Sequence, residues 1–210
     1  MKKIFVAFMC IFACFLQACS TKYAQISYSR PDIETDVSAV FVFPTTTPDS
    51  EVNTATQLIG VSIYSKWSSI YGKKAIPTGP DIEQLLKQKN IREAYVKVVS
   101  TLDNVSVLEQ TLRNENVRKF LNLLIEELKI GKDSRIALSI MFGTEKGYDK
   151  DEPVYVNIGL FDVNNLTWKL ITKTESKKGK ITTFKVDYNG IVNQHFSSIK
   201  RNVEPIKSEK

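Results

Sequence analysis

The chain changes its hydrophobic period along its length, and these changes constrain the fold more than any single motif does. Val37 to Phe43 is a nearly continuous apolar run closed by Pro44, typical of a strand covered on both faces. Apolar residues then recur at three- and four-residue steps: Val52, Ala55, Ile59, Ile63, Trp67 and Ile70. This spacing predicts a helix that starts near Pro48 and stops at Gly72. A short strand over 74–76 completes a β-α-β unit.

The middle of the chain carries further helix signals. Gly79-Pro80-Asp81 predicts a helix start, because proline at the first helical position has no amide hydrogen bond to lose. The segment 91–102 fits two structures: Tyr95 to Val99 has strand propensity, but the apolar spacing fits one helix face better, and we predict a helix. Further helices are predicted over 108–112 and over 117–128, the second ending at Gly131.

The final third of the chain has strand-like alternation. We predict a buried strand over 136–142 and a second strand over 154–161. Asn164-Asn165 predicts a tight hairpin turn, because asparagine tolerates left-handed backbone angles, and the returning strand covers 168–172. Asp187 is a suitable cap for a closing helix. The apolar face of that helix would be Tyr188, Ile191, Val192, Phe196 and Ile199.

These elements predict an α/β (α+β) fold. We expect a mixed sheet of about four to five strands, with a β-α-β start, a helical middle, a C-terminal β-hairpin and a closing helix. The chain has 210 residues, enough for one domain that buries well over half of its unfolded surface.

The first nineteen residues have the organisation of a secretion signal. Lys2 and Lys3 supply positive charge, and the apolar run over 4–16 is 13 residues long, short of the roughly 20 that span a bilayer. The sequence Leu16-Gln17-Ala18-Cys19 resembles the lipobox of bacterial lipoproteins, which is cut before its cysteine. An uncleaved anchor helix and an ordinary signal peptide are the alternatives.

The lipoprotein resemblance implies that Cys19 is the first mature residue and carries diacylglycerol on its sulfur, with a further acyl chain on its amine. Two or three acyl chains make a stable bilayer anchor. By the sorting rule of this family, Ser20 in place of aspartate implies the outer membrane, with the domain in the periplasm. The chain then divides into a signal peptide over 1–18, a lipidated tether over 19–36, a single periplasmic domain over 37–200 and a disordered tail over 201–210.

Cysteine content and charge exclude several function classes for the mature chain. Cys10 and Cys14 leave with the signal peptide, so with Cys19 lipidated there is neither a disulfide nor a thiol nucleophile. Loss of Lys2 and Lys3 lowers the formal charge from +6 to +4, and the remaining positive residues are dispersed. Nucleic acid is therefore not an expected partner, whereas contact with the cell wall remains open.

The remaining candidate site residues favour structural roles. His195 is the single histidine, which excludes a histidine-rich zinc site, and we interpret it as a boundary residue of the closing helix rather than a base. The acidic loop over 147–153 lacks EF-hand spacing and has Lys150 at its centre, so a solvated connection is favoured over a calcium site. Trp67 and Trp168 are expected in the core.

No catalytic residue, metal site or cofactor is predicted. There is no Gly-rich phosphate loop. A basic patch is formed by Lys173, Lys177, Lys178 and Lys180. We interpret it as a polar loop, with contact to anionic headgroups or cell-wall phosphate as the alternative.

The order of elements carries a second resemblance. The strand ending in Phe43-Pro44, the long helix after it, and the hairpin Phe161-Asp162-Val163-Asn164-Asn165-Leu166-Thr167-Trp168 resemble a group of periplasmic α/β domains. The group comprises the amino-terminal domain of the Tol-Pal translocation protein, the curli-secretion lipoprotein and the lipoprotein activators of penicillin-binding proteins. The resemblance covers about 37–200 and implies a module that docks onto other envelope proteins, with no catalytic residues.

The sequence therefore favours a non-enzymatic envelope lipoprotein that acts as an interaction or assembly component. The partners would be the bilayer, through acylated Cys19, and another envelope protein. The alternative is a binding module for a small ligand or cell-wall glycan, which would use the loop Pro44 to Thr47 at the end of the first strand. An envelope hydrolase is a third alternative, for which the sequence names no residues.

Overall fold

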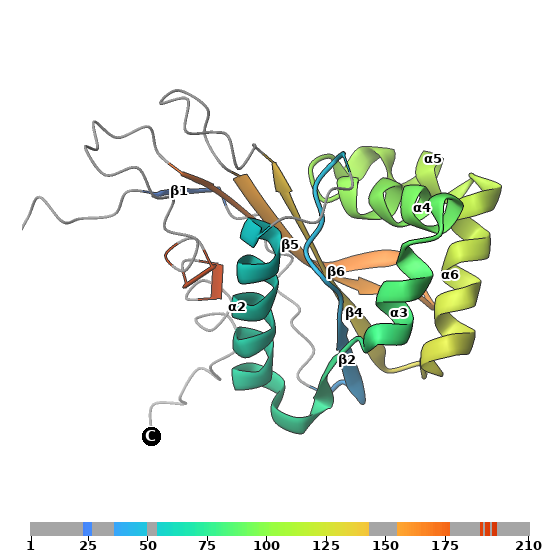
Figure 1. Cartoon of the computed structure of the whole chain (residues 1–210), viewed down its shortest axis with the longest axis horizontal. Helices are drawn as coiled ribbons and strands as arrows, with labels where there is room; N and C mark the ends of the chain where they lie inside the picture. Colours follow the sequence, from blue (N-terminus) through green and yellow to red (C-terminus); the bar gives the residue numbers. More distant parts are fainter. Residues whose placement is uncertain are drawn as a thin grey trace, which may run out of the picture.

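The computed structural model describes residues 23–26, 36–49, 54–142 and 155–176, together with 190, 192, 193, 195 and 196. A six-stranded mixed sheet in the order β1-β6-β5-β4-β2-β3 forms its centre (Figure 1). The strands are β1 (Tyr23–Ile26), β2 (Ala39–Val42), β3 (Ala75–Pro77), β4 (Ser134–Phe142), β5 (Tyr155–Asp162) and β6 (Thr167–Ser176). The helices are α2 (Thr54–Tyr71), η1 (Gly72–Lys74), α3 (Pro80–Leu86), α4 (Lys89–Ser100), η2 (Val105–Val107), α5 (Leu108–Leu112) and α6 (Glu115–Leu128).

The fold class is the predicted one. β2 pairs in parallel with β3 and with β4, whereas β4, β5 and β6 form an antiparallel meander. The β-α-β start is β2-α2-β3, and the C-terminal hairpin is β5-β6. Parallel pairing at the centre explains why the sequence of β2 is nearly continuous apolar residues, since both of its faces are covered.

The sixth strand, β1, was not predicted. It lies within the segment 19–36 that we interpreted as a tether, and it pairs antiparallel with the end of β6, Tyr23 opposite Ser176 and Ile26 opposite Lys173. A four-residue strand whose partner lies far along the chain leaves no periodic pattern. The segment 19–36 therefore contributes an edge strand to the sheet.

The helices cover the two faces of the sheet unequally (Figure 1). α2 lies on one face, where Ile59, Ile63 and Trp67 pack with β2, β4 and β5 in one hydrophobic cluster. The α3–α6 group lies on the opposite face, where Val98, Leu102 and other buried residues of these helices form a second cluster. The alternation along β2 divides its side chains between the two layers.

The ambiguous segment 91–102 is helical up to Ser100, as predicted, and forms most of α4, whose apolar face is buried except for the half-buried Ile91. The predicted stop of α6 at Gly131 is wrong. Lys129 takes the left-handed conformation, with φ 50°, and the Ile130 amide donates to the Ile125 carbonyl. These bonds form a Schellman motif, so the helix ends at Leu128, three residues before the glycine.

The hairpin turn also differs from its prediction in detail. Neither Asn164 nor Asn165 has a positive φ, whereas Leu166 does, at 51°. The loop over 163–166 connects β5 to β6, and the Asp162 carboxylate accepts hydrogen bonds from both asparagine backbone amides at 3.1 and 3.0 Å. A four-residue loop with an aspartate cap therefore replaces the expected two-residue turn.

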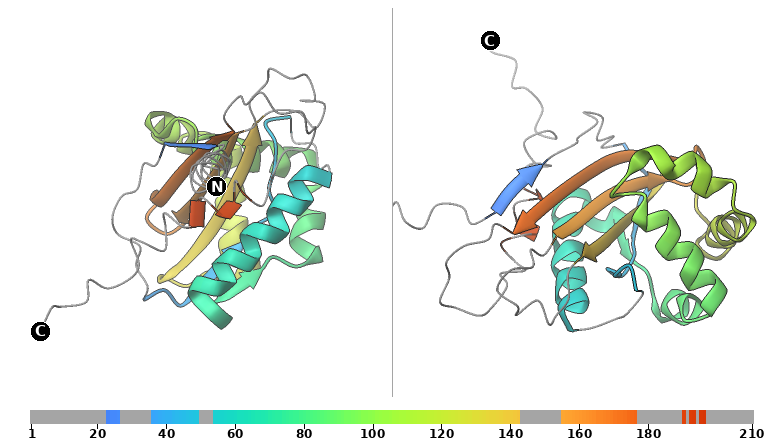
Figure 2. Two further views of the ribbon diagram at one scale, coloured as in Figure 1. Left: turned by 90° about the vertical axis from the view of Figure 1, so that its left-hand side faces the viewer. Right: turned by 90° about the horizontal axis from the view of Figure 1, so that it is seen from above.

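The closing helix is described only in part. Residues 190, 192, 193, 195 and 196 are helical, and these short pieces, drawn in red, lie on the α2 side of the sheet (Figure 2). Val192 and Phe196 belong to the hydrophobic cluster of α2. The Phe196 ring meets Trp67 edge to face, with 4.8 Å between centroids. Asp187, Tyr188, Ile191 and Ile199 lie outside the described residues, as does the tail over 201–210.

A candidate ligand groove at the end of the central strands

A groove of about 540 Å³ opens at the carboxyl ends of β2 and β3. The chain leaves β2 toward α2 on one face and leaves β3 toward α3 on the other, so the two connections diverge here. Open α/β sheets place ligands at this kind of divergence. The loop Pro44 to Thr47, which the alternative function assigned from the sequence would use, forms one wall through Pro44, Thr45 and Thr46.

The groove wall is held by bonds to the neighbouring strand β4. The Thr45 hydroxyl lies 2.8 Å from the Ser139 hydroxyl. The Thr46 amide donates to the Ser139 carbonyl at 3.2 Å, and the Met141 amide donates to the Thr46 carbonyl at 2.8 Å. The loop thus continues the sheet by one parallel bridge instead of projecting freely.

Tyr95 on α4 fixes the other end of this loop. Its hydroxyl donates to the Pro44 carbonyl at 2.7 Å, and its ring stacks on Phe43 with 5.9 Å between centroids. Burial raises the pKa of Tyr95 above its ordinary value, because a phenolate would be desolvated there. Tyr95 is therefore a neutral hydrogen-bond donor that positions the loop.

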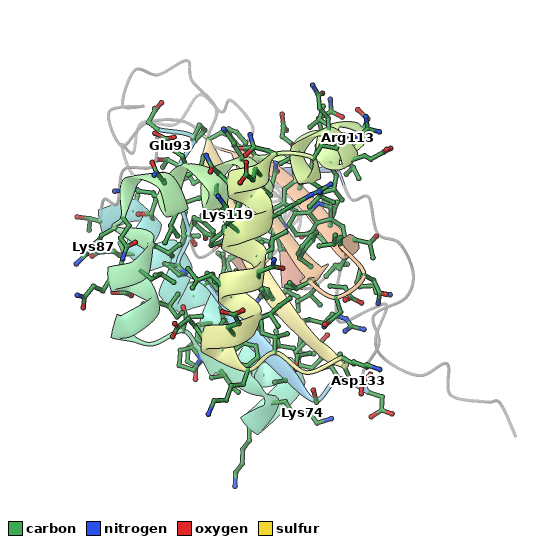
Figure 3. All side chains as sticks on the ribbon, turned by 90° about the vertical axis from the view of Figure 1, so that its right-hand side faces the viewer. Lys74, Lys87, Glu93, Arg113, Lys119 and Asp133 are labelled. Carbon is green, nitrogen blue, oxygen red and sulfur yellow. The ribbon has the colours of Figure 1, made fainter. Side chains whose placement is uncertain are left out.

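Three charged residues stand at the rim of the groove: Glu83 and Lys87 from α3 and its C-cap, and Arg92 from α4. Figure 3 shows Lys87 at the corner between α3 and α4. The side chain of Arg92 is half-buried. Within the described part of the chain, neither Lys87 nor Arg92 forms an ion pair, so the rim carries an excess of one positive charge.

A second hollow, of about 750 Å³, lies at the opposite end of the sheet between the start of β4 and the β5-β6 loop. Two of its lining residues, Arg135 and Lys169, lie 3.5 and 3.7 Å from the carboxylate of Asp162, which is fully buried beneath the hollow. Burial acts to raise the pKa of Asp162, but hydrogen bonds from Asn165 and the two cations outweigh it, and the net pKa is lowered. The carboxylate is ionised and fully engaged by its own surroundings.

His195 is fully buried, so its interpretation as a boundary residue is corrected to a core position. Its Nδ1 lies 2.7 Å from the Thr172 hydroxyl on β6. Burial lowers the pKa of His195 to about 3, against a smaller opposing effect from a hydrogen bond with the Val156 backbone. The imidazole is neutral and inaccessible, and it joins the closing helix to the sheet.

Both tryptophans are core residues, as predicted. Trp67 is fully buried on the inner face of α2. Trp168 donates from Nε1 to the Thr101 hydroxyl at 2.9 Å, and its ring meets Phe161 edge to face. Gly159 allows this packing, since a Cβ there would lie 2.5 Å from Leu102 and 2.8 Å from Trp168.

Several predicted sites lie outside the described residues. They are the lipobox Leu16, Gln17, Ala18 and Cys19, the acidic loop over 147–153, and Lys177, Lys178 and Lys180 of the basic patch. Lys173, the described member of that patch, lies 3.5 Å from Asp103 Oδ1 and also donates to the Asp103 backbone carbonyl. This lysine is therefore engaged within the domain.

The described residues hold neither a metal-binding cluster nor a membrane-spanning helix. They contain no cluster of three or more histidine, cysteine, aspartate or glutamate side chains placed to hold a metal ion. Among the same residues, no helix combines the length and hydropathy needed to cross a bilayer.

The sequence matches no protein-family model and no curated protein. Among solved structures, the chain is similar to the PelC dodecamer from Paraburkholderia phytofirmans, at 10% identity and a TM-score of 0.45, covering 86% of this chain and 96% of that one. A variant of the PelC dodecamer from the same organism gives 9% identity, a TM-score of 0.42 and the same coverage. Similarity at this level establishes neither a shared activity nor a shared partner.

Sequence reasoning found the loop of the groove but not the residues opposite it. Tyr95, Arg92 and Glu83 come from helices whose placement depends on tertiary packing. The sequence did mark Gly60 as unusual. A glycine inside a clear helical period has a helix propensity about 1 kcal/mol worse than that of alanine, which indicates a special role at that position. The sequence also indicated a role for Asp162, since aspartate shortly before two asparagines is typical of a capped turn.

Proposed function

We propose that this protein is a lipid-anchored envelope lipoprotein whose domain is an interaction or assembly component of an envelope complex. In this proposal the acyl chains on Cys19 hold it at the outer membrane, the domain lies in the periplasm, and no reaction is catalysed. The anchor is supported by the sequence Leu16 to Cys19, preceded by a short apolar run and two lysines.

The observation that carries the interaction role is an apolar strip on the outer face of α2. Leu58 and Val61 are 54% and 70% exposed, and Val61 also lines the groove. Isolated exposed apolar residues are ordinary, but two on one helix face beside a hollow form a surface that a protein partner could cover. We therefore propose that the partner contacts α2 beside the groove.

Photo-crosslinking in cells tests this proposal at native expression. A photoreactive amino acid in place of Val61 is expected to capture one defined envelope protein. The same substitution at Asn122, an exposed position on α6 on the other side of the sheet, is the matched control. Equal capture at both positions, or recovery of lipid and random neighbours only, would contradict the proposal.

The anchor is tested separately. Cys19→Ser is expected to leave an uncleaved precursor that a fatty-acid probe does not label, because the thiol that accepts diacylglycerol is lost. Cys14→Ser, which alters a cysteine inside the apolar run, is the control and should be labelled like the natural chain. Unchanged labelling of Cys19→Ser would remove the lipoprotein assignment.

Small-ligand binding is the second candidate function. The groove favours it, because a hollow of about 540 Å³ has the size of small-molecule sites, roughly 300–1,000 Å³. It is lined by the Pro44 to Thr47 loop, at the position where ligands bind in open α/β sheets. Saturable binding that protects the chain from thermal unfolding would support it.

A further inference from the structure

The chemistry of the groove narrows the class of ligand that it would accept. Its lining is largely apolar and includes Val42, Phe43, Pro44, Pro77 and Leu86. Apolar surface of this kind gains free energy by covering a hydrocarbon or ring, at about 25 cal/mol for each Å² removed from water. The groove therefore suits a ligand with an apolar body.

Three hydroxyl groups of the lining are already engaged within the protein. Thr45 is bonded to Ser139, Tyr95 donates to the Pro44 carbonyl, and Thr78 donates to the Val42 carbonyl at 3.1 Å. A glycan leaves many of its own hydroxyls unpaired in a site that offers few free hydroxyl partners, which is unfavourable. Among the two ligand classes named by the sequence, the lining thus disfavours the glycan.

The rim selects the charge of the ligand. Lys87 and Arg92 are positive, Glu83 is negative, and within the described residues neither cation has an ionic partner. Arg92 is half-buried, which raises the strength of its interaction with an anion relative to a fully exposed pair. Arginine also presents paired donors that match a carboxylate or phosphate.

Gly60 keeps the groove open. It lies inside α2, where glycine costs about 1 kcal/mol relative to alanine, and its backbone needs no positive φ. A Cβ at this position would lie 3.5 Å from Thr45 Oγ1 and 3.6 Å from its amide nitrogen, which is ordinary contact. Helix geometry and close packing therefore do not demand this glycine, but any longer side chain would enter the groove it lines.

We propose that the groove binds a small amphiphilic anion. The apolar body lies beside Gly60 and the Pro44 to Thr47 loop, and the carboxylate or phosphate pairs with Arg92 and Lys87. This inference rests on the ligand-binding candidate above and names its ligand class.

The test is an NMR titration of the full chain with probes that share one tail and differ in headgroup. Octanoate and octyl phosphate are expected to bind saturably and shift the amides of Thr45 and Gly60. Octylammonium and 1-octanol should bind about tenfold more weakly, because they lose the charge-assisted bonds. Acetate, which has no apolar body, should produce no saturable shift over the same range. Equal binding of octanoate and octylammonium would overturn the proposal.

Substitutions assign the two halves of the site. Arg92→Gln is expected to reduce the preference for octanoate over octylammonium about tenfold, whereas Lys97→Gln, the same charge change at an exposed position of α4, should leave it unchanged. Gly60→Leu should abolish binding of octanoate and of 1-octanol by filling the groove. Wild-type affinity in Gly60→Leu, or amide shifts located away from the groove, would contradict the proposal.

Gly60→Ala keeps the test decisive if Gly60→Leu fails to fold. Alanine fits the observed space, so this variant should stay folded and bind octanoate more weakly than the natural chain. Unchanged affinity would count against a role of Gly60 in the groove.

The results of these ligand tests can be distinguished from a failure of the interaction proposal. Capture of a protein at Val61 without octanoate binding would retain the docking role and remove the ligand class.

Discussion

The two ends of the central sheet both carry a hollow lined by charged residues, but their charges are arranged in opposite ways. At the amino end of β4, Asp162 is fully buried and neutralised by Arg135 and Lys169. At the carboxyl end of β2, Arg92 and Lys87 have no ionic partner among the described residues. The Asp162 cluster beside the larger hollow is thus a structural junction, and the smaller, more apolar hollow is the candidate site. Volume alone does not identify a binding site.

The largest expected effect is on stability and comes from removing the carboxylate of the structural junction at the amino end of β4. Asp162→Ala should lower the free energy of unfolding by about 3–5 kcal/mol, because it leaves the nearly buried Arg135 without its carboxylate and removes the cap of the β5-β6 loop. Chemical denaturation measures this loss. Binding of octanoate by the fraction that remains folded should not change.

The exposed pair Arg113–Glu109 is the control for that prediction. It is shorter, at 2.6 Å, but its side chains are 73% and 82% exposed. Arg113→Ala should therefore change stability by less than about 1 kcal/mol. Equal losses in the two variants would show that burial does not distinguish the junction from the surface.

The second prediction concerns acid. The folded state holds His195 with a pKa of about 3, whereas the unfolded chain protonates it near its ordinary value of 6.5. The contribution of neutral His195 to the free energy of unfolding is therefore present above pH 6.5 and is lost as the pH falls toward 3. At pH 5 the loss is about 2 kcal/mol. His195→Gln should flatten this dependence in denaturation curves recorded from pH 7 to pH 5. A slope that persists in the variant would assign the acid sensitivity to other groups.

The third prediction tests whether the Tyr95 hydroxyl holds the groove wall in place. Tyr95→Phe should lower the free energy of unfolding by about 1–2 kcal/mol, because the Pro44 carbonyl loses its hydrogen bond while the ring stacking on Phe43 is kept. Hydrogen exchange at the Thr46 and Met141 amides, which bond the loop and β4 together, should accelerate more than exchange at Asn164 and Asn165. Uniform acceleration at both ends of the sheet would contradict a local role.

The smallest expected effect is a gain. Gly60→Ala should raise the free energy of unfolding by up to about 1 kcal/mol, since alanine is the better helix former and its Cβ meets only ordinary contacts. A higher midpoint of thermal unfolding, together with weaker octanoate binding, would show that Gly60 lowers the stability of the fold but keeps the groove open for the ligand. A loss of stability would show that the glycine is required for packing.

Local periodicity predicted most of the elements, and tertiary contacts decided the rest. Helix α4 was predictable from the sequence because its apolar residues define one face over three turns. The strand β1 was not, because four residues that pair only with β6 carry no local signal. The end of α6 was misplaced because Lys129 adopts the left-handed conformation that the rule assigns to glycine.

The candidate site was predictable in one half only. The loop Pro44 to Thr47 follows from the rule that ligands meet the carboxyl ends of parallel strands. Arg92 and Tyr95 reach the same place through the packing of α4 against the opposite face, which no pattern in the sequence encodes. The burial of His195 was missed for a related reason, since the partner of its ring, Thr172, lies on β6.

An NMR titration of the full chain with octanoate compares the two ends of the sheet in one experiment. We expect saturable amide shifts at Thr45 and Gly60 and none at Asn164 and Asn165. Shifts centred on the asparagines, or no saturable shift at either end, would contradict the assignment of the carboxyl-end groove as the binding site.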